Sequence, residues 1–145
     1  MNTCPTSEEW NLRAEWCESQ ISNRSADASY LVSEQACALL FEVQTCYCAG
    51  AWIAVIILCY TALDAHLREV ETGDYQSNGK DLLDSVGLDH RYQQLRKRRN
   101  RLVHIEENKP SVTIDALFDD QYSRQTTAQD AIQLTADVFL MSPGT

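Results

Sequence analysis

The chain contains few of the residues that turn a backbone. Its 145 residues include five glycines and three prolines, and this scarcity favours a few long helices over many short strands. Long hydrophobic runs are missing as well. The most apolar segment, Ala49 to Leu63, covers 15 residues before Asp64, whereas a bilayer requires about 18 to 20. We therefore expect a buried core helix in this segment and no membrane partner.

The N-terminal segment lacks the pattern of a secretory signal. Residues 1–18 carry acids and tryptophans, where a signal needs a basic end followed by an apolar run. This favours a cytoplasmic location. The chain also has six cysteines, but no Cys or His pairs stand at zinc spacing. We expect free thiols buried in helices, with no metal site and no cofactor.

Apolar residues recur at helical spacing through most of the chain. A capping-box pattern, Thr6 with Glu9, predicts a first helix over 7–21. Further stripes predict helices over about 28–46, 50–72, 88–103 and 123–141, with short helical pieces at 81–88 and 114–118. A break near Cys46 to Gly50 is expected because one helix over 28–72 would be about 68 Å long, too long for a compact domain. The sequence therefore predicts one all-α domain over 1–145, a bundle of four or five helices in which 1–27 form an N-terminal helix or extension.

Positive charge is concentrated in one segment of an acidic chain. The formal charge is −9, yet the segment from Arg91 to Arg101 carries +6, which leaves −15 for the rest. Such a run is either a solvated helix face paired with the protein's acids or a set of phosphate contacts. Arg99 differs from its neighbours because it falls on the apolar stripe between Leu95 and Leu102, where an unpaired charge is costly to bury.

The same segment contains the sequence RNRLVH, residues 99–104, whose side chains suit RNA cleavage. Histidine can exchange a proton with a ribose hydroxyl near neutral pH, and a guanidinium can stabilise negative charge on phosphate. On an ideal helix Arg99 and His104 lie about 140° apart, whereas Asn100 and His104 lie about 40° apart. Arg99 joins His104 only if the helix ends near Val103 and the chain turns, or if a second subunit completes the site. The simpler interpretation of His104 is a residue that closes a helix and is favoured by the helix dipole.

RNRLVH resembles the R-x4-6-H motif of HEPN domains (higher eukaryotes and prokaryotes nucleotide-binding), which has a polar residue after the arginine. Ala54 to Glu69 and the closing segment AQDAIQLTADVF are also similar to helices of that family, so the resemblance covers most of the chain from about residue 28. It implies an up-and-down bundle that forms a homodimer with two motifs in one cleft. Arg99 would then stabilise phosphate, His104 would act as acid or base, and Asn100 would orient one of them. Asp64 resembles an acid that some members direct toward the cleft, although an internal ion pair is the competing explanation.

Active members of the family are metal-independent endoribonucleases, often toxins of toxin–antitoxin pairs or phage-defence effectors. The resemblance therefore implies RNA as substrate, with phosphate contacts from further basic residues, namely Arg96, Lys97, Arg98 and Arg101. A non-catalytic module that partners a nucleotidyltransferase or antitoxin is the alternative, supported by the net charge of −9. A helical regulator that binds a small ligand is a third alternative. His66 and His90 are expected to be surface or structural residues.

Overall fold

The computed structural model describes residues 4–25 and 30–142, and within them the chain forms seven α-helices and no strand. The all-α prediction is confirmed. The helices are α1 (Ser7–Ser25), α2 (Glu34–Ala49), α3 (Trp52–His66), α4 (Gly79–Val86), α5 (His90–Val103), α6 (Ile114–Asp119) and α7 (Gln121–Phe139). A π-helical segment, Leu67–Thr72, continues α3 without a break.

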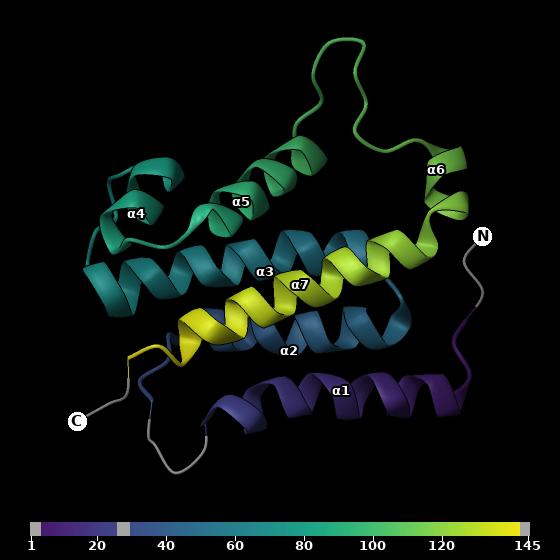
Figure 1. The fold of residues 1–145 in the computed structure, drawn as a ribbon, viewed down its shortest axis with the longest axis horizontal. Helices are drawn as coiled ribbons and strands as arrows, with labels where there is room; N and C mark the ends of the chain where they lie inside the picture. The colour runs from purple at the N-terminus through teal and green to yellow at the C-terminus, as the bar shows by residue number, and fades with distance from the viewer. Residues whose placement is uncertain (1–3, 26–29, 143–145) are drawn as a thin grey trace.

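The five longer helices, α1, α2, α3, α5 and α7, reverse direction at each step along the chain, as in an up-and-down bundle (Figure 1). The predicted count of four or five helices is too low. The helices beyond that count are α4 and α6, which correspond to the short pieces predicted at 81–88 and 114–118. Each has its own cap: the Asn78 side chain accepts from the Asp81 N–H at 2.9 Å, and Thr113 accepts from the Ala116 N–H at 3.1 Å. An Asx or Thr cap satisfies N–H groups that a short helix would otherwise leave unpaired.

Local signals in the sequence set the bounds of the first two helices. The Thr6 N–H donates to Glu9 Oε2 at 2.8 Å, and the Glu9 N–H donates to Thr6 Oγ1 at 3.1 Å, which confirms the capping box. The predicted break near 46–50 is also confirmed. Gly50 ends α2 with φ of 78°, a left-handed conformation that favours glycine, and its N–H bonds the last carbonyls of the helix.

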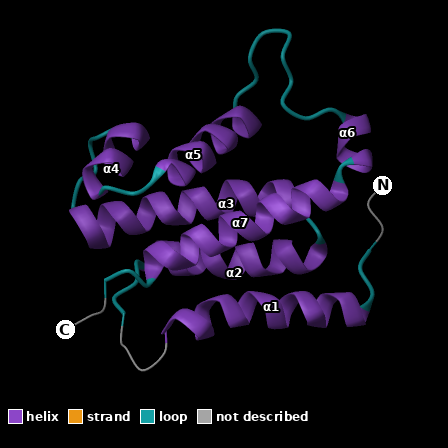
Figure 2. Ribbon diagram, viewed as in Figure 1, coloured by secondary structure: helices purple, strands orange, loops and turns teal. Residues whose placement is uncertain are grey.

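Helix α3 is the centre of the core. It lies between α2, α5 and α7 (Figure 2), and Val55, Cys59, Ala62 and Leu63 are fully buried on it. Surrounding helices cover nearly every face of α3, so an all-round apolar sequence is what its position requires. Among the described residues, no helix is long and apolar enough to cross a membrane.

All six cysteines are free thiols, as expected, but their predicted burial is only partly correct. Cys17, Cys48 and Cys59 are buried and Cys46 is intermediate, whereas Cys4 and Cys37 are exposed. Cys37 departs from the prediction because it lines an open hollow between α1 and α2.

Candidate functional site

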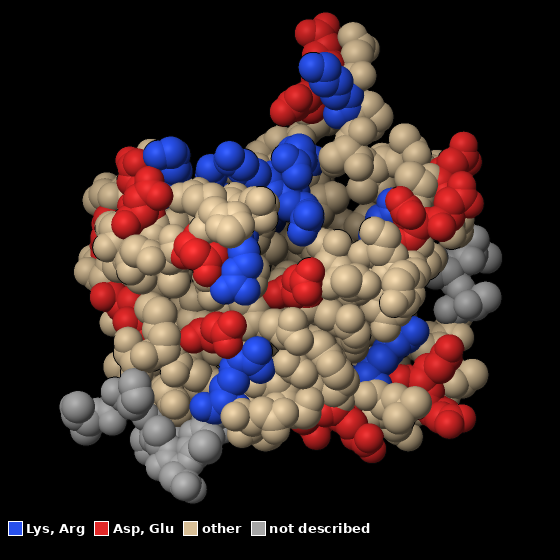
Figure 3. Space-filling model, in the orientation of Figure 1, with Lys and Arg blue, Asp and Glu red and all other residues tan. Residues whose placement is uncertain are grey.

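The basic residues of α5 remain largely without acidic partners. Figure 3 shows Lys and Arg side chains gathered over α5. Arg91 pairs with Asp89 at 2.8 Å, but within 4–25 and 30–142 no ion pair is formed by the other five basic residues of the segment, Arg96, Lys97, Arg98, Arg99 and Arg101. The interpretation of this run as a face neutralised by the protein's own acids therefore fits Arg91 alone.

Arg99 is half-buried and lies over an aromatic ring. Its guanidinium carbon stands 4.8 Å from the centroid of the Tyr60 ring on α3, a cation–π contact. The Nε of Arg99 is buried and has no hydrogen-bond partner in the described part of the chain. The aromatic face thus supports the arginine on the apolar stripe without neutralising its charge.

Tyr60 is enclosed where α3, α4 and α5 meet. Its hydroxyl is buried with no hydrogen-bond partner among the described residues, and a Cβ added at Gly79 would lie 2.7 Å from it and 3.1 Å from Arg96 Cδ. Burial, and then the negative charge of Asp64, raise the pKa of Tyr60 to about 12, against the opposing effect of Arg99 and other arginines. The hydroxyl therefore stays neutral at physiological pH, and the ring of Tyr60 packs beneath Arg99.

Asp64 lies one turn after Tyr60 on α3. Its Oδ2 accepts a hydrogen bond from Arg68 Nε at 2.9 Å, and both side chains are mostly covered. This is the internal ion pair that was the competing explanation for Asp64. The pair lies close enough to Tyr60 for both charges to act on its hydroxyl, so Asp64 and Arg99 occupy the same region of the α3–α5 contact.

His104 caps the C-terminal end of α5. The helix ends at Val103, and His104 takes an extended conformation (φ −124°, ψ 123°) while its N–H donates to the Asn100 carbonyl at 2.9 Å. Its side chain is exposed. In the described part of the chain no side-chain hydrogen bond or ion pair joins His104 to Arg99, Asn100 or Asp64. The chain places Arg99 in the last turns of α5 and His104 directly after the helix, and it does not bring their side chains together.

His66 is a buried titratable residue that was expected to be at the surface or structural. It is 0% exposed, its ring stacks on Phe139 with centroids 4.5 Å apart, and Glu71 Oε1 lies 3.5 Å from Nε2 without forming a hydrogen bond. Burial lowers the pKa of His66, against the opposing effect of Glu71 and Glu69. Its position between Leu63 and Leu67 on the apolar helix was the sequence signal for burial.

No protein-family model, curated protein or solved structure matches the chain. Among the described residues, no group of three or more His, Cys, Asp or Glu side chains is arranged to hold a metal ion. The candidate site therefore rests on the α3–α5 region itself, that is, on Arg99 over Tyr60, the unpaired basic residues of α5 and the exposed His104.

Proposed function

We propose that the protein is a metal-independent endoribonuclease of HEPN type that acts as a homodimer in the cytoplasm, as a toxin or a phage-defence effector. The observation that carries the proposal is Arg99: a half-buried arginine held on the Tyr60 ring with its charge unpaired. A cation held in this way is ready to accept an anionic ligand, and phosphate is the anion that a guanidinium fork matches best.

The proposed chemistry uses the 2′-hydroxyl of RNA as the nucleophile. His104 takes the proton from that hydroxyl or gives one to the leaving 5′ oxygen, while Arg99 stabilises the charge that develops on the phosphoryl oxygens. Asn100 orients one of the two. The neighbouring unpaired cations Arg96, Lys97, Arg98 and Arg101 bind adjacent phosphates.

The separation of the two reactive side chains supports the proposed homodimer. Because His104 closes α5 and points into solvent while Arg99 faces α3, a second copy is needed to bring a histidine to each arginine. We expect a dimer in solution by light scattering. A protein that stays monomeric at the concentrations used for cleavage would contradict this arrangement.

The test of the proposal is cleavage of single-stranded RNA by pure protein in EDTA. We expect His104→Ala to slow cleavage by about 10²- to 10⁴-fold, the usual contribution of a general acid or base. Arg99→Ala should slow it by about 10²- to 10³-fold, as for the loss of one charge-stabilising donor. His90→Ala is the matched control, since His90 is an exposed histidine at the other end of the same helix. Equal cleavage activity in the wild type and in His104→Ala would contradict the proposal.

A second candidate function is a non-catalytic module that binds a nucleotidyltransferase or antitoxin. It is favoured by a set of exposed apolar side chains on and around α6, which buries no residue fully: Ile105, Ile114, Phe118 and Tyr122. Of these, Phe118 and Tyr122 line the same hollow, and exposed apolar residues that lie together are typical of a protein interface. Growth arrest on expression that needs His104 would favour catalysis, whereas partner binding that survives His104→Ala and is lost on Phe118→Asp would favour this alternative.

A further inference from the structure

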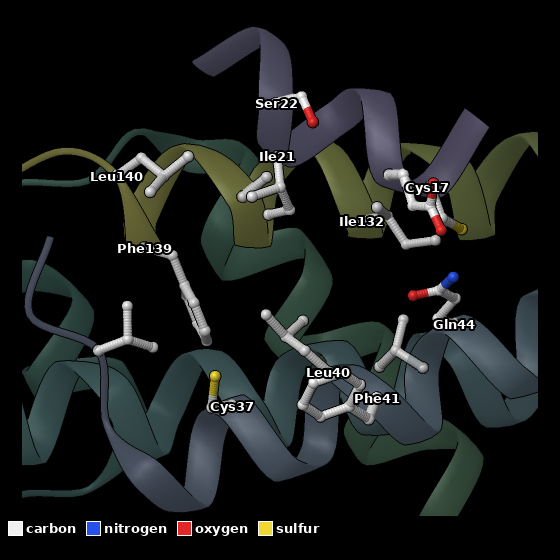
Figure 4. Close-up of a pocket in the computed structure, with 14 residues that line it drawn as sticks. Cys17, Ile21, Ser22, Cys37, Leu40, Phe41, Gln44, Ile132, Phe139 and Leu140 are labelled. Atoms are coloured by element: carbon white, nitrogen blue, oxygen red, sulfur yellow. The ribbon is translucent and has the colours of Figure 1, made fainter. Parts of the chain in front are cut away.

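A second region of the molecule, separate from the basic site around Arg99, is a hollow between α1 and α2 that has α7 as its floor. Its volume is about 510 Å³, within the range of small-molecule binding sites. Figure 4 shows Phe139 projecting from α7 into this space toward α2, with Ile21 and Ile132 on the opposite side from Leu40 and Phe41. The hollow is therefore bounded by three helices.

The lining of this hollow is mostly apolar. Val43, Ile132, Ala136 and Phe139 form buried surfaces of it, and Phe41 stands at its mouth with 72% of its surface exposed. Water in such a space finds few hydrogen-bonding partners, so an apolar ligand that displaces it gains free energy. The apolar lining therefore favours a ligand with a hydrocarbon chain.

Two polar residues of the lining, Glu18 and Gln44, bear on the choice of head group. Figure 4 shows Gln44 pointing from α2 toward Cys17 of α1. Glu18, the residue after Cys17, is the one charged residue among the described residues that line the space. A lone carboxylate attracts a cation and repels an anion, and the acidic net charge of −9 adds to that preference.

We propose that the hollow between α1, α2 and α7 binds a cationic amphiphile, a molecule with an alkyl chain and a protonated amine head, with the head beside Glu18 and Gln44. The chain would lie along Ile132, Ala136 and Phe139. This site does not depend on RNA cleavage, since none of its lining residues belongs to the α3–α5 site.

Cys37 provides a reporter at this site. It lines the hollow and is exposed, whereas Cys4 is also exposed but lies outside it. Of the remaining thiols, Cys17 and Cys59 are buried and burial raises the pKa of each to about 12, so they react slowly with alkylating reagents. Two thiols of one chain thus serve as probe and internal control.

The experiment measures alkylation of Cys37 and Cys4 by iodoacetamide, followed by mass spectrometry, in the full chain with dodecylammonium or dodecanoate below their micellar concentrations. We expect dodecylammonium to slow the alkylation of Cys37 at least fivefold and to leave the alkylation rate of Cys4 unchanged. Dodecanoate should have little effect on either rate. Equal slowing of both cysteines, or equal protection by the two amphiphiles, would overturn the proposal. Protection of Cys37 that rises with protein concentration alone would instead assign the hollow to a contact between copies.

The head-group assignment is tested by Glu18→Gln. Because Glu18 is exposed, water screens the attraction between its carboxylate and the ammonium head group. Removal of that charge should therefore weaken dodecylammonium binding by about threefold. Glu15→Gln is the matched control: Glu15 is exposed on the same helix, does not line the hollow and has the same charge. An equal effect of the two substitutions would mean that only the overall charge attracts the amphiphile and would overturn the assigned role of Glu18.

Discussion

Helix α3 buries two aromatic side chains whose polar atoms lack hydrogen-bond partners in the described structure, and the two differ in what covers them. Tyr60 lies beneath Arg99 of α5, and His66 lies against Phe139 of α7 with Glu71 nearby. The pKa of Tyr60, raised to about 12, keeps it neutral, whereas a histidine can gain a proton near physiological pH. The free-energy cost of burying polar atoms without hydrogen-bond partners is therefore independent of pH at Tyr60, whereas at His66 it depends on pH.

The largest effect that would test this comparison comes from removing the His66 ring. We expect His66→Ala to lower the free energy of unfolding by about 3 kcal/mol, because a buried ring is replaced by a cavity beside Phe139. His66→Phe keeps the stacking and deletes two nitrogens that make no hydrogen bond, although it also removes the 3.5 Å contact of Nε2 with Glu71, so it should cost about 1 kcal/mol or less. Urea denaturation measures both. His90→Ala, at an exposed histidine, should change stability by less than about 0.5 kcal/mol, and a similar small effect for His66→Ala would contradict the burial argument.

The second effect is the pH dependence of stability. Because burial lowers the pKa of His66 in the folded protein, the unfolded chain, whose histidines titrate near about 6.5, binds more protons below that pH. Stability is therefore fully present above about pH 6.5 and falls as pH decreases through this value, with a slope of at most about 1.4 kcal/mol per pH unit from this one group. Thermal melts between pH 8 and pH 5 should show this fall.

His66→Phe provides the control for the pH series, since it removes the titrating ring and keeps its packing. Its stability should depend less on pH between 5 and 6.5 than that of the wild type. The aspartates that accept several hydrogen bonds, Asp74 and Asp89, have pKa values lowered to about 2, so their contribution is lost at more acidic pH. Parallel curves for wild type and His66→Phe would show that His66 does not titrate in this range.

The smallest effect concerns Tyr60. Gly79→Ala places a Cβ 2.7 Å from the Tyr60 hydroxyl, and we expect a loss of about 1 to 2 kcal/mol in the free energy of unfolding. Tyr60→Phe alone should be nearly neutral, because the hydroxyl has no partner in the described structure to lose. The double variant should recover much of the loss, since the clashing atom is gone. Additive effects in this double-mutant cycle would contradict the contact.

The helical architecture was largely readable from the sequence because local signals set it. The Thr6–Glu9 box, the Gly50 break and the all-round apolar character of α3 each act within a few residues. The short helices α4 and α6 were placed approximately, although the total count was too low. The exposure of Cys37 was missed, because it depends on the space left between α1 and α2, which no local pattern encodes.

The site shows why spacing alone is an incomplete guide. Arg99 and His104 are five residues apart at the end of an α-helix, and the described contacts do not join their side chains. His66 and Glu71 are also five apart, yet they approach to 3.5 Å. The π-helical winding of Leu67–Thr72 explains the difference, because its wider turn brings residues five apart onto nearly the same face. Nothing in the local sequence indicates this change from regular α-helical winding.

The segment between α5 and α6 projects from the body of the molecule (Figure 1). Every residue from His104 to Ser111 is exposed, and the tip is closed by an isolated bridge between Glu106 and Lys109. Exposed loop tips of this kind are where proteases cut and where inserted sequence is tolerated. A nick or an inserted domain here would leave the bundle folded while displacing His104, so this loop is a place where folding and the proposed reaction can be separated.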